Sequence, residues 1–147
     1  MRIKDIARIE GREAITIKPN AGLSEAIKTL VTNTIGAMPV CDFKGTLLGI
    51  ISERDILKWI HHNADAIGKA KVKDIMTTNV VVGDPEDDVA EILEKMMERG
   101  VRHLPIMTGN RVVGMLSLRD VIEEQCKEYH SQVRYLHDYI AGGYSQS

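Results

Sequence analysis

Two aspartates in the chain each follow a serine by three residues, inside two runs of similar sequence. The first run is GIISERDIL at residues 49–57, and the second is GMLSLRDVI at residues 114–122. A carboxylate at the C-terminal end of a strand can accept two hydrogen bonds from the cis-diol of a sugar. The same residues also fit a helix start, in which the serine caps the helix and the aspartate lies in its first turn. The spacing alone leaves both interpretations open.

The length of the acidic side chain favours a second role. Glutamate is the usual partner of a capping serine, because it reaches back to the backbone N–H of the cap. Aspartate is one methylene shorter, so we expect the carboxylates of Asp55 and Asp120 to be left for a ligand. If they only cap helices, asparagine should replace them well, since asparagine is itself a good cap.

The serine–aspartate motif is one of several features that occur twice. The paired positions lie 65 to 69 residues apart: Asp5 with Asp74, Pro19 with Pro85, Pro39 with Pro105, Gly49 with Gly114, and Ser52 with Ser117. A separation of this length indicates two copies of one small unit, not a solenoid array. Each copy is too small to bury its core well, so we expect the two copies to pack face to face.

Both copies show the same order of expected elements. A short β-branched strand ends at a proline, a helix with apolar residues at helical spacing follows, a hairpin comes next, and a last helix begins at the serine. This order of strand, helix, strand, strand, helix predicts an α+β fold with the repeats packed sheet to sheet. The elements are expected at 14–18, 23–31, 38–51 and from Ser52, then at 79–83, 89–97, 104–116 and from Ser117.

A C-terminal helical extension should continue the last helix of the second copy. Its apolar residues are spaced 4, 3, 4, 3 and 4 apart, which is a heptad pattern. Fewer than three heptads cannot hold a coiled coil alone, so this tail stripe should pack on a second subunit or back on its own module. The tail stripe consists of Ile122, Cys126, Tyr129, Val133, Leu136 and Ile140. The expected organisation is a first repeat at 1–62, a linker at 63–71, a second repeat at 72–124, the extension at 125–141 and a disordered tail at 142–147.

Composition and charge exclude several classes of partner. The chain has 147 residues, a formal net charge of -2 and 27% charged residues, so no basic field is available for nucleic acid or anionic lipid. No apolar run approaches the roughly 18 residues of a membrane span. Two cysteines without zinc-type or CxxC spacing fit a reducing compartment, so we expect a cytoplasmic location and neither a membrane nor a nucleic-acid partner.

No catalytic residue and no metal site are expected. A nucleophile would have to be Cys41 or Cys126, and no base is apparent near either. Cys126 lies in the tail stripe with His130 and His137 on its flanks, so a metal site there is disfavoured. We therefore do not expect an enzyme.

The doubled pattern resembles a tandem pair of cystathionine β-synthase (CBS) domains, also called the Bateman module. The resemblance covers residues 1–124 and rests on the paired Pro39 and Pro105 and on the twofold Gly-x-x-Ser-x-x-Asp. It implies that the repeats pair pseudosymmetrically and that their sheets line two clefts, which in this family often bind adenine nucleotides or other adenosyl ligands. No cofactor beyond such a regulatory ligand is implied.

The resemblance also assigns residues to each cleft. In the first cleft Ser52 and Asp55 would contact ribose, and in the second Ser117 and Asp120 would do so. The rest of the first cleft would be Val80, Val81, Val101, Arg102, His103, Leu104 and Pro105, and the rest of the second would be Thr16, Ile35, Gly36, Ala37, Met38 and Pro39.

The two clefts are not expected to be equivalent. Arg102 and His103 are basic, as are residues near phosphate in the nucleotide-sensing kinase gamma subunits of this family, whereas their counterparts are Gly36 and Ala37. Arginine suits phosphate, so a phosphorylated ligand should prefer the first cleft, with the second empty or holding a less charged adenosyl compound. In the alternative, Arg102 pairs with a surface carboxylate and His103 only covers the sheet edge.

Two functions follow as expectations. The first is a homodimeric sensor that binds AMP, ADP, ATP or S-adenosylmethionine between its repeats and signals to an effector protein in trans. The second is a structural dimerisation module that binds no ligand, in which Ser-x-x-Asp only caps helices. The sequence does not distinguish among the adenosyl ligands.

Overall fold

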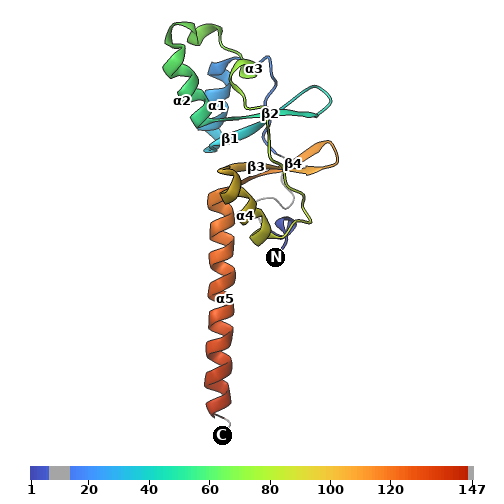
Figure 1. The fold of residues 1–147 in the computed structure, drawn as a ribbon, viewed down its shortest axis with the longest axis vertical. Coiled ribbons are helices and arrows are strands. Elements are labelled where there is room, and N and C mark those ends of the chain that lie inside the picture. The colour runs from blue at the N-terminus through green and yellow to red at the C-terminus, as the bar shows by residue number, and fades with distance from the viewer. Residues whose placement is uncertain (7–13, 146–147) are drawn as a thin grey trace.

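Two antiparallel hairpins, one from each repeat, lie side by side where the two repeats meet (Figure 1). The structure is a computed structural model and describes residues 1–6 and 14–145, with side chains described as far as residue 142. In the first repeat β1 (Ala37–Cys41) pairs with β2 (Leu47–Ser52), and in the second β3 (His103–Thr108) pairs with β4 (Arg111–Ser117). An antiparallel bridge between Thr46 and Arg111 connects the two hairpins.

Two helices accompany each hairpin in the same order along the chain. They are α1 (Leu23–Asn33) and α2 (Glu53–His62) in the first repeat, and α4 (Val89–Arg99) and α5 (Leu118–Ser145) in the second. Three short helices complete the described part: η1 (Ile3–Asp5), η2 (Ala64–Lys69) and α3 (Val72–Ile75). The predicted α+β fold of two repeats is confirmed.

The first expected strand of each repeat is reduced to a single parallel bridge, between Ile17 and Val40 and between Gly83 and Ile106. Ile17 donates its N–H to the Pro39 carbonyl at 3.0 Å, and its own carbonyl accepts from the Cys41 N–H at 3.0 Å. Pairing ends there because a proline, which has no N–H for a ladder, follows within two residues in both copies.

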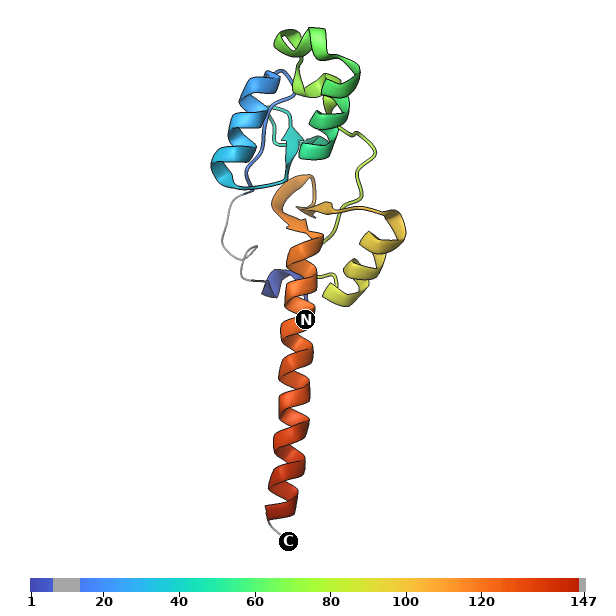
Figure 2. The same ribbon diagram turned by 90° about the vertical axis from the view of Figure 1, so that its left-hand side faces the viewer.

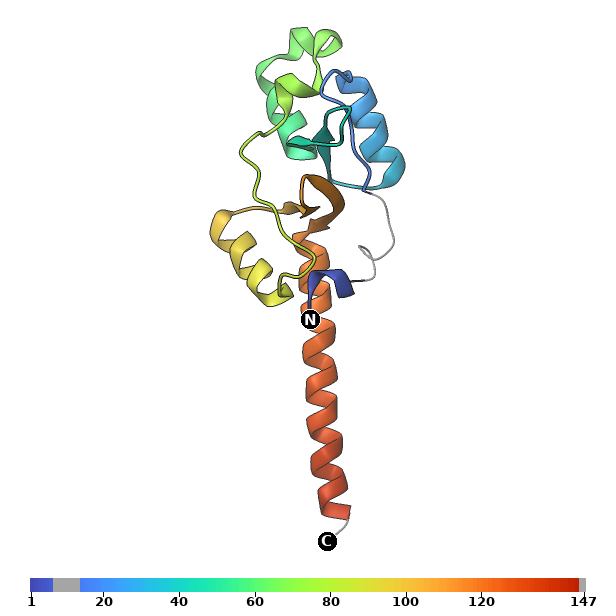
Figure 3. The same cartoon turned by 90° about the vertical axis from the view of Figure 1, so that its right-hand side faces the viewer.

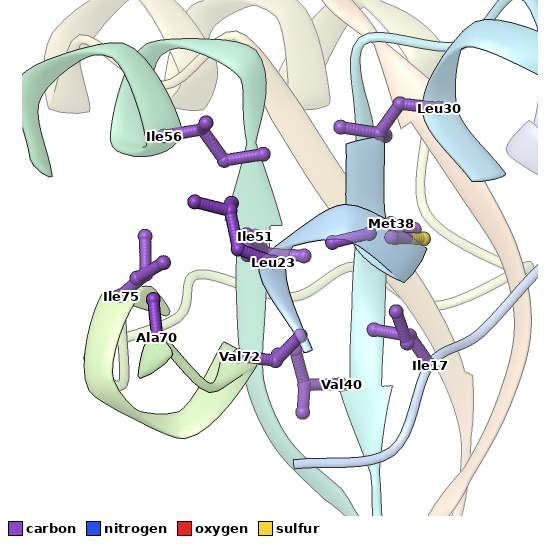
Figure 4. Close-up of a cluster of buried hydrophobic side chains, with 11 residues drawn as sticks. Ile17, Leu23, Leu30, Met38, Val40, Ile51, Ile56, Ala70, Val72 and Ile75 are labelled. Carbon is purple, nitrogen blue, oxygen red and sulfur yellow. The ribbon is translucent and has the colours of Figure 1, made fainter. Parts of the chain in front are cut away.

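The opening segment of each repeat packs into the hydrophobic core of the other repeat. Ile3 and Ile6, at the start of the chain, are at most 1% exposed and lie in the core of the second repeat. Val72 and Ile75 of α3 lie in the core of the first, against Ile51 and its neighbours (Figure 4). This exchange joins the repeats, because each core includes side chains from the opening segment of the other.

Helix α5 begins in the second repeat and then projects away from both (Figures 1, 2 and 3). It continues to Ser145, so residues 142–145, expected to be disordered, are helical, and residues 146–147 lie outside the described part. Val121 is fully buried, but every side chain from Tyr129 to Gly142 is exposed. The tail stripe therefore does not pack on its own module, which was one of the two arrangements predicted for it.

The helices in the described part of the chain do not meet the length and hydropathy required to cross a membrane.

Candidate functional site

A cavity of about 740 Å³ opens between the two repeats at the start of α5. The first repeat contributes residues 14–15 and 33–37, from the end of α1 to the start of β1. The second repeat contributes His103, then Gly114, Met115 and Ser117 of β4, and Arg119, Asp120 and Glu123 of α5. A cavity of this size is in the range that holds small organic ligands.

Both Ser-x-x-Asp motifs form reciprocal caps at the start of their helices. Ser52 Oγ accepts from the Asp55 N–H at 3.1 Å, and Asp55 Oδ2 accepts from the Ser52 N–H at 3.0 Å. The equivalent distances are 3.1 Å and 3.3 Å between Ser117 and Asp120. The prediction that aspartate is too short to reach back is therefore wrong, because the extended backbone of the cap brings its N–H within reach of the shorter side chain.

A capping bond uses only part of the hydrogen-bonding capacity of a carboxylate, which has two oxygens and about four acceptor sites. In the first repeat the remaining sites are partly occupied, since Asp55 Oδ1 accepts from Thr77 Oγ1 at 3.1 Å and Oδ2 also accepts from Ser52 Oγ at 2.9 Å. In the second repeat Asp120 is 8% exposed and lines the cavity. The two motifs share a cap but differ in their surroundings.

Most of the residues predicted for the second cleft come together in this cavity. Ile35, Gly36 and Ala37 of the first repeat lie across from Ser117 and Asp120 of the second. Three predicted residues lie elsewhere. Thr16 lines a neighbouring cavity of about 300 Å³ together with Lys18 and Arg111, while Met38 and Pro39 are buried in β1.

The residues predicted for the first cleft are more dispersed. Leu104 and Pro105 are buried in β3, and Val80, Val81 and Val101 are half-buried outside the two cavities. Arg102 is exposed, and its carbonyl accepts from the Leu118 N–H at 2.8 Å. Ser52 and Asp55 are held by their mutual bonds and by Thr77.

His103 lines the cavity of Asp120, although its sequence position suggested the cleft of Asp55. The strand register is the reason: His103 pairs directly with Ser117 across the β3–β4 hairpin. Side chains of directly opposed residues stand on the same face of a sheet, so the imidazole lies beside the Ser117 side chain.

Several cavity residues were missed from the sequence, and two of them had a readable signal. Met115 precedes Ser117 by two residues in β4, and alternate residues of a strand share a face. Glu123 follows Asp120 by three residues in α5, and such residues are neighbours on a helix surface. Asn33 and Thr34 directly precede Ile35, which the resemblance did assign to this cleft, but no motif assigned these two residues to it.

The charged groups give the cavity a negative balance. Asp120 and Glu123 carry the carboxylates, and Arg119 pairs with Glu123 through an Nε–Oε1 distance of 3.2 Å. Burial lowers the pKa of His103, so the imidazole is neutral at neutral pH and adds no positive charge. Among the described lining residues, two carboxylates face one guanidinium, which disfavours a polyphosphate and accommodates a neutral or cationic group.

The pKa of His103 also predicts how stability depends on pH. Burial lowers this pKa below its usual value near 6.5, Glu53 and Asp120 raise it in part, and Arg102 lowers it further. The unfolded chain therefore binds more protons in this range, and the free energy of unfolding should decrease as the pH falls from about 6.5 through the folded-state pKa. Between about pH 7.5 and pH 5.5 the urea midpoint should fall more for the unmodified chain than for His103→Gln. Parallel midpoints in the two proteins would contradict this assignment.

The structure also describes the surroundings of Cys41 and the distribution of side chains that could bind a metal ion. Burial raises the pKa of the Cys41 thiol, which makes the reactive thiolate scarcer. Within residues 1–6 and 14–145 no group of three or more His, Cys, Asp or Glu side chains is arranged to hold a metal ion.

Comparisons with known proteins agree with this architecture. The CBS domain model matches residues 3–62 and 72–127. The structure is similar to the CBS-domain containing protein ATU1752 from Agrobacterium tumefaciens, with a TM-score of 0.78, 32% identity, and coverage of 85% of this chain and 99% of that chain. It is also similar to the CBS domain pair of protein MJ0100 in complex with 5′-methylthioadenosine and S-adenosyl-L-methionine, with a TM-score of 0.78, 29% identity, and coverage of 87% and 98%.

One curated relative is considerably longer than the region it shares with this chain. Protein MJ1225 of Methanocaldococcus jannaschii is 29% identical over 118 residues, which are 80% of this chain and 41% of MJ1225. The family model matches one segment in each repeat and together these segments cover most of the chain. The resemblance noted in the sequence is thus confirmed, and the chain belongs to the CBS domain family, with two CBS domains in tandem.

Proposed function

We propose that this protein is a regulatory, non-enzymatic module that binds an adenosine-containing ligand in the cavity between its two repeats. The observation that carries the proposal is the convergence of the Ser117–Asp120 motif with residues 35–37 of the opposite repeat in one cavity. The related CBS domain pair of MJ0100, which is 29% identical, contains 5′-methylthioadenosine and S-adenosyl-L-methionine. The two ligands of MJ0100 contain adenosine, and they support the proposal of an adenosine-containing ligand for this chain.

Each wall of the cavity has a distinct part in this proposal. The Asp120 carboxylate accepts hydrogen bonds from the ribose hydroxyls, as acidic residues do in other nucleotide sites. Ile35 and Ala37 with the intervening backbone hold the adenine. A side chain at Gly36 would narrow this wall, because a Cβ there would lie 3.1 Å from His103 Nε2 and 3.4 Å from Glu53 Oε1.

The charge of the cavity reduces the range of candidate ligands further. Among the described residues of the cavity, Asp120 and Glu123 are opposed by Arg119, so a neutral thioether or a cationic sulfonium is better accommodated there than a triphosphate. We therefore propose 5′-methylthioadenosine or S-adenosylmethionine for this cavity, ahead of AMP, ADP or ATP.

A second, phosphate-bearing site at Ser52 and Asp55 is proposed from the family resemblance. Arg102 is exposed and remains the candidate for phosphate, together with Val80, Val81 and Val101. His103 is no longer assigned there, since it lines the other cavity. The protein is further proposed to act in the cytoplasm as a homodimer and to transmit ligand binding to an effector protein in trans.

One observation favours the competing function of a structural module without a ligand. Both Ser-x-x-Asp motifs make the reciprocal capping bonds that this alternative requires. Caps explain the motifs as helix starts, but they do not explain why the second motif lines a cavity of about 740 Å³ together with the opposite repeat.

Thermal unfolding with a panel of adenosyl compounds tests the proposal. At a hundred times its dissociation constant, a ligand stabilises the folded chain by about 2.7 kcal/mol, which raises the midpoint by roughly 5 to 10 °C. We expect this shift with 5′-methylthioadenosine or S-adenosylmethionine and a smaller one with ATP at equal concentration. If AMP shifts the midpoint, Arg102→Ala should reduce that shift and leave the shift with 5′-methylthioadenosine unchanged. No shift with any compound would favour the structural module.

A further inference from the structure

The tail stripe presents apolar side chains to solvent along the part of α5 that projects from the module. Tyr129 is 64% exposed, Val133 65%, Leu136 57% and Ile140 57%. Their spacing of three and four residues places them on one face of the helix. A helix that exposes such a face without a covering partner is more stable when another apolar surface covers it.

The residue types in the stripe indicate what that surface is. When the stripe is written as heptads, Cys126, Val133 and Ile140 take position a, and Ile122, Tyr129 and Leu136 take position d. In parallel coiled coils, β-branched residues at a with leucine at d favour two strands over three or four. Val133, Ile140 and Leu136 follow this rule, so the stripe is suited to an identical stripe.

The residues that flank the stripe do not oppose such pairing. In a parallel pair each g residue faces the e residue of the next heptad on the other helix. Gln125 would face His130, and Gln132 would face His137. These are amide–imidazole pairs that can form hydrogen bonds, and no like charges are brought together.

The shortness of the stripe is offset by how α5 begins. Starting an isolated helix is costly, because its first hydrogen-bonded turn fixes several residues for a single hydrogen bond. Here the first turn is already fixed by the Ser117 cap and by the burial of Val121 in the second repeat. Pairing of two tails therefore does not have to nucleate the helix.

We infer that the tail stripe is the surface through which two copies of this chain pair, as a parallel coiled coil of their α5 helices. The inference deepens the proposed homodimer by naming its interface and orientation. The argument for this interface does not rest on the proposed ligand, because the cavity is built within one chain.

The first experiment measures molecular mass by sedimentation equilibrium over about 1 to 100 µM protein. We expect a dimer that dissociates on dilution. Leu136→Asp buries a charge in the stripe and should weaken the dimer by at least about 100-fold. Ser131→Asp, at an exposed position three residues before Arg134 and outside the stripe, is the matched control and should leave the dimer intact. A monomer for the unmodified chain at the highest concentration, or a dimer for Leu136→Asp, would overturn the interface.

The second experiment uses Cys126, which is an exposed free thiol, to read the orientation. In a parallel pair the two copies of Cys126 face each other at position a. Their Cα atoms then lie within the range of about 4.4 to 6.8 Å that a disulfide requires. In an antiparallel pair Cys126 faces Leu136, about 15 Å along the helix from the other thiol. Diamide, an azo oxidant that takes up two electrons and two protons as two thiols join, should therefore link the native dimer, but not Cys126→Ser. A dimer that is not linked would overturn the parallel orientation.

The two proposals fail separately. Leu136→Asp should still bind 5′-methylthioadenosine in the cavity, so loss of the dimer with retained binding leaves the ligand proposal in place. A dimer without ligand binding leaves the tail interface in place.

Discussion

Replacement of Asp120 by asparagine should weaken the binding of 5′-methylthioadenosine by about 10- to 100-fold, because hydrogen bonds to a charged acceptor contribute about 1.5 to 3 kcal/mol. Asparagine is nearly isosteric, and its amide oxygen can still accept from the Ser117 N–H, so the fold should be retained. The loss then reports the ribose contact and not the start of α5. Isothermal titration calorimetry measures the dissociation constant, and the urea midpoint checks that the variant is folded.

The repeat supplies a matched control for this substitution. Asp55→Asn changes the same motif, but Asp55 bonds to Ser52 and Thr77 and lies outside the cavity of Asp120. We expect this variant to bind 5′-methylthioadenosine nearly as the unmodified chain does. Equal losses in both variants would contradict the assignment of the ligand to the Asp120 cavity, and unchanged binding in both would reduce the motifs to helix caps.

Gly49→Ala should lower the free energy of unfolding by about 2 to 3 kcal/mol, which is the cost of overpacking a buried site. A Cβ at residue 49 would lie 2.7 Å from the Thr77 carbonyl oxygen and 3.0 Å from Met76 Sδ. The first contact is with backbone that cannot move aside easily, since Thr77 exchanges hydrogen bonds of 2.9 Å and 2.8 Å with Ile50. The thermal midpoint should fall by roughly 5 to 10 °C.

Gly68→Ala provides the comparison for Gly49→Ala. A Cβ at residue 68 meets no atom within 4 Å, so the substitution should leave the midpoint nearly unchanged. If the two variants unfold alike, the close approach of β2 to the segment at Thr77 does not constrain the fold.

The repeat allowed the order of the secondary-structure elements to be predicted from the sequence. The positions of single side chains were harder to predict. The hairpins and their helices were expected because prolines, glycines and the serine–aspartate motif recur in one order. The strands predicted at the start of each repeat are only single bridges at Ile17 and Gly83, because a nearby proline limits the ladder. The exchange of Ile3 and Val72 between the two cores had no local signal, because it depends on contacts between distant segments.

In the candidate site too, the positions of side chains depend on contacts that have no local signal in the sequence. Asp120 and residues 35–37 were placed together by the family resemblance, and the structure brings them to one cavity. The resemblance assigned His103 to the cleft of Asp55 with the rest of residues 101–105, but strand pairing with Ser117 decides which way it faces. The capping bond of Asp55 was missed because side-chain length was considered without the extended backbone of the cap.

Because α5 is one continuous helix, a small tilt at its cavity end displaces its far end by a larger distance. Asp120 and Glu123 line the cavity near one end of the helix, and Ile140 lies near the other, in an element of 28 residues that spans about 42 Å. A tilt of about 5° at the cavity would move the far end by roughly 4 Å, which is several times the tolerance of close-packed side chains. If a ligand repositions Asp120 even slightly, two paired tails must adjust or separate. Affinity for the ligand and affinity between the copies would then depend on each other by the same factor.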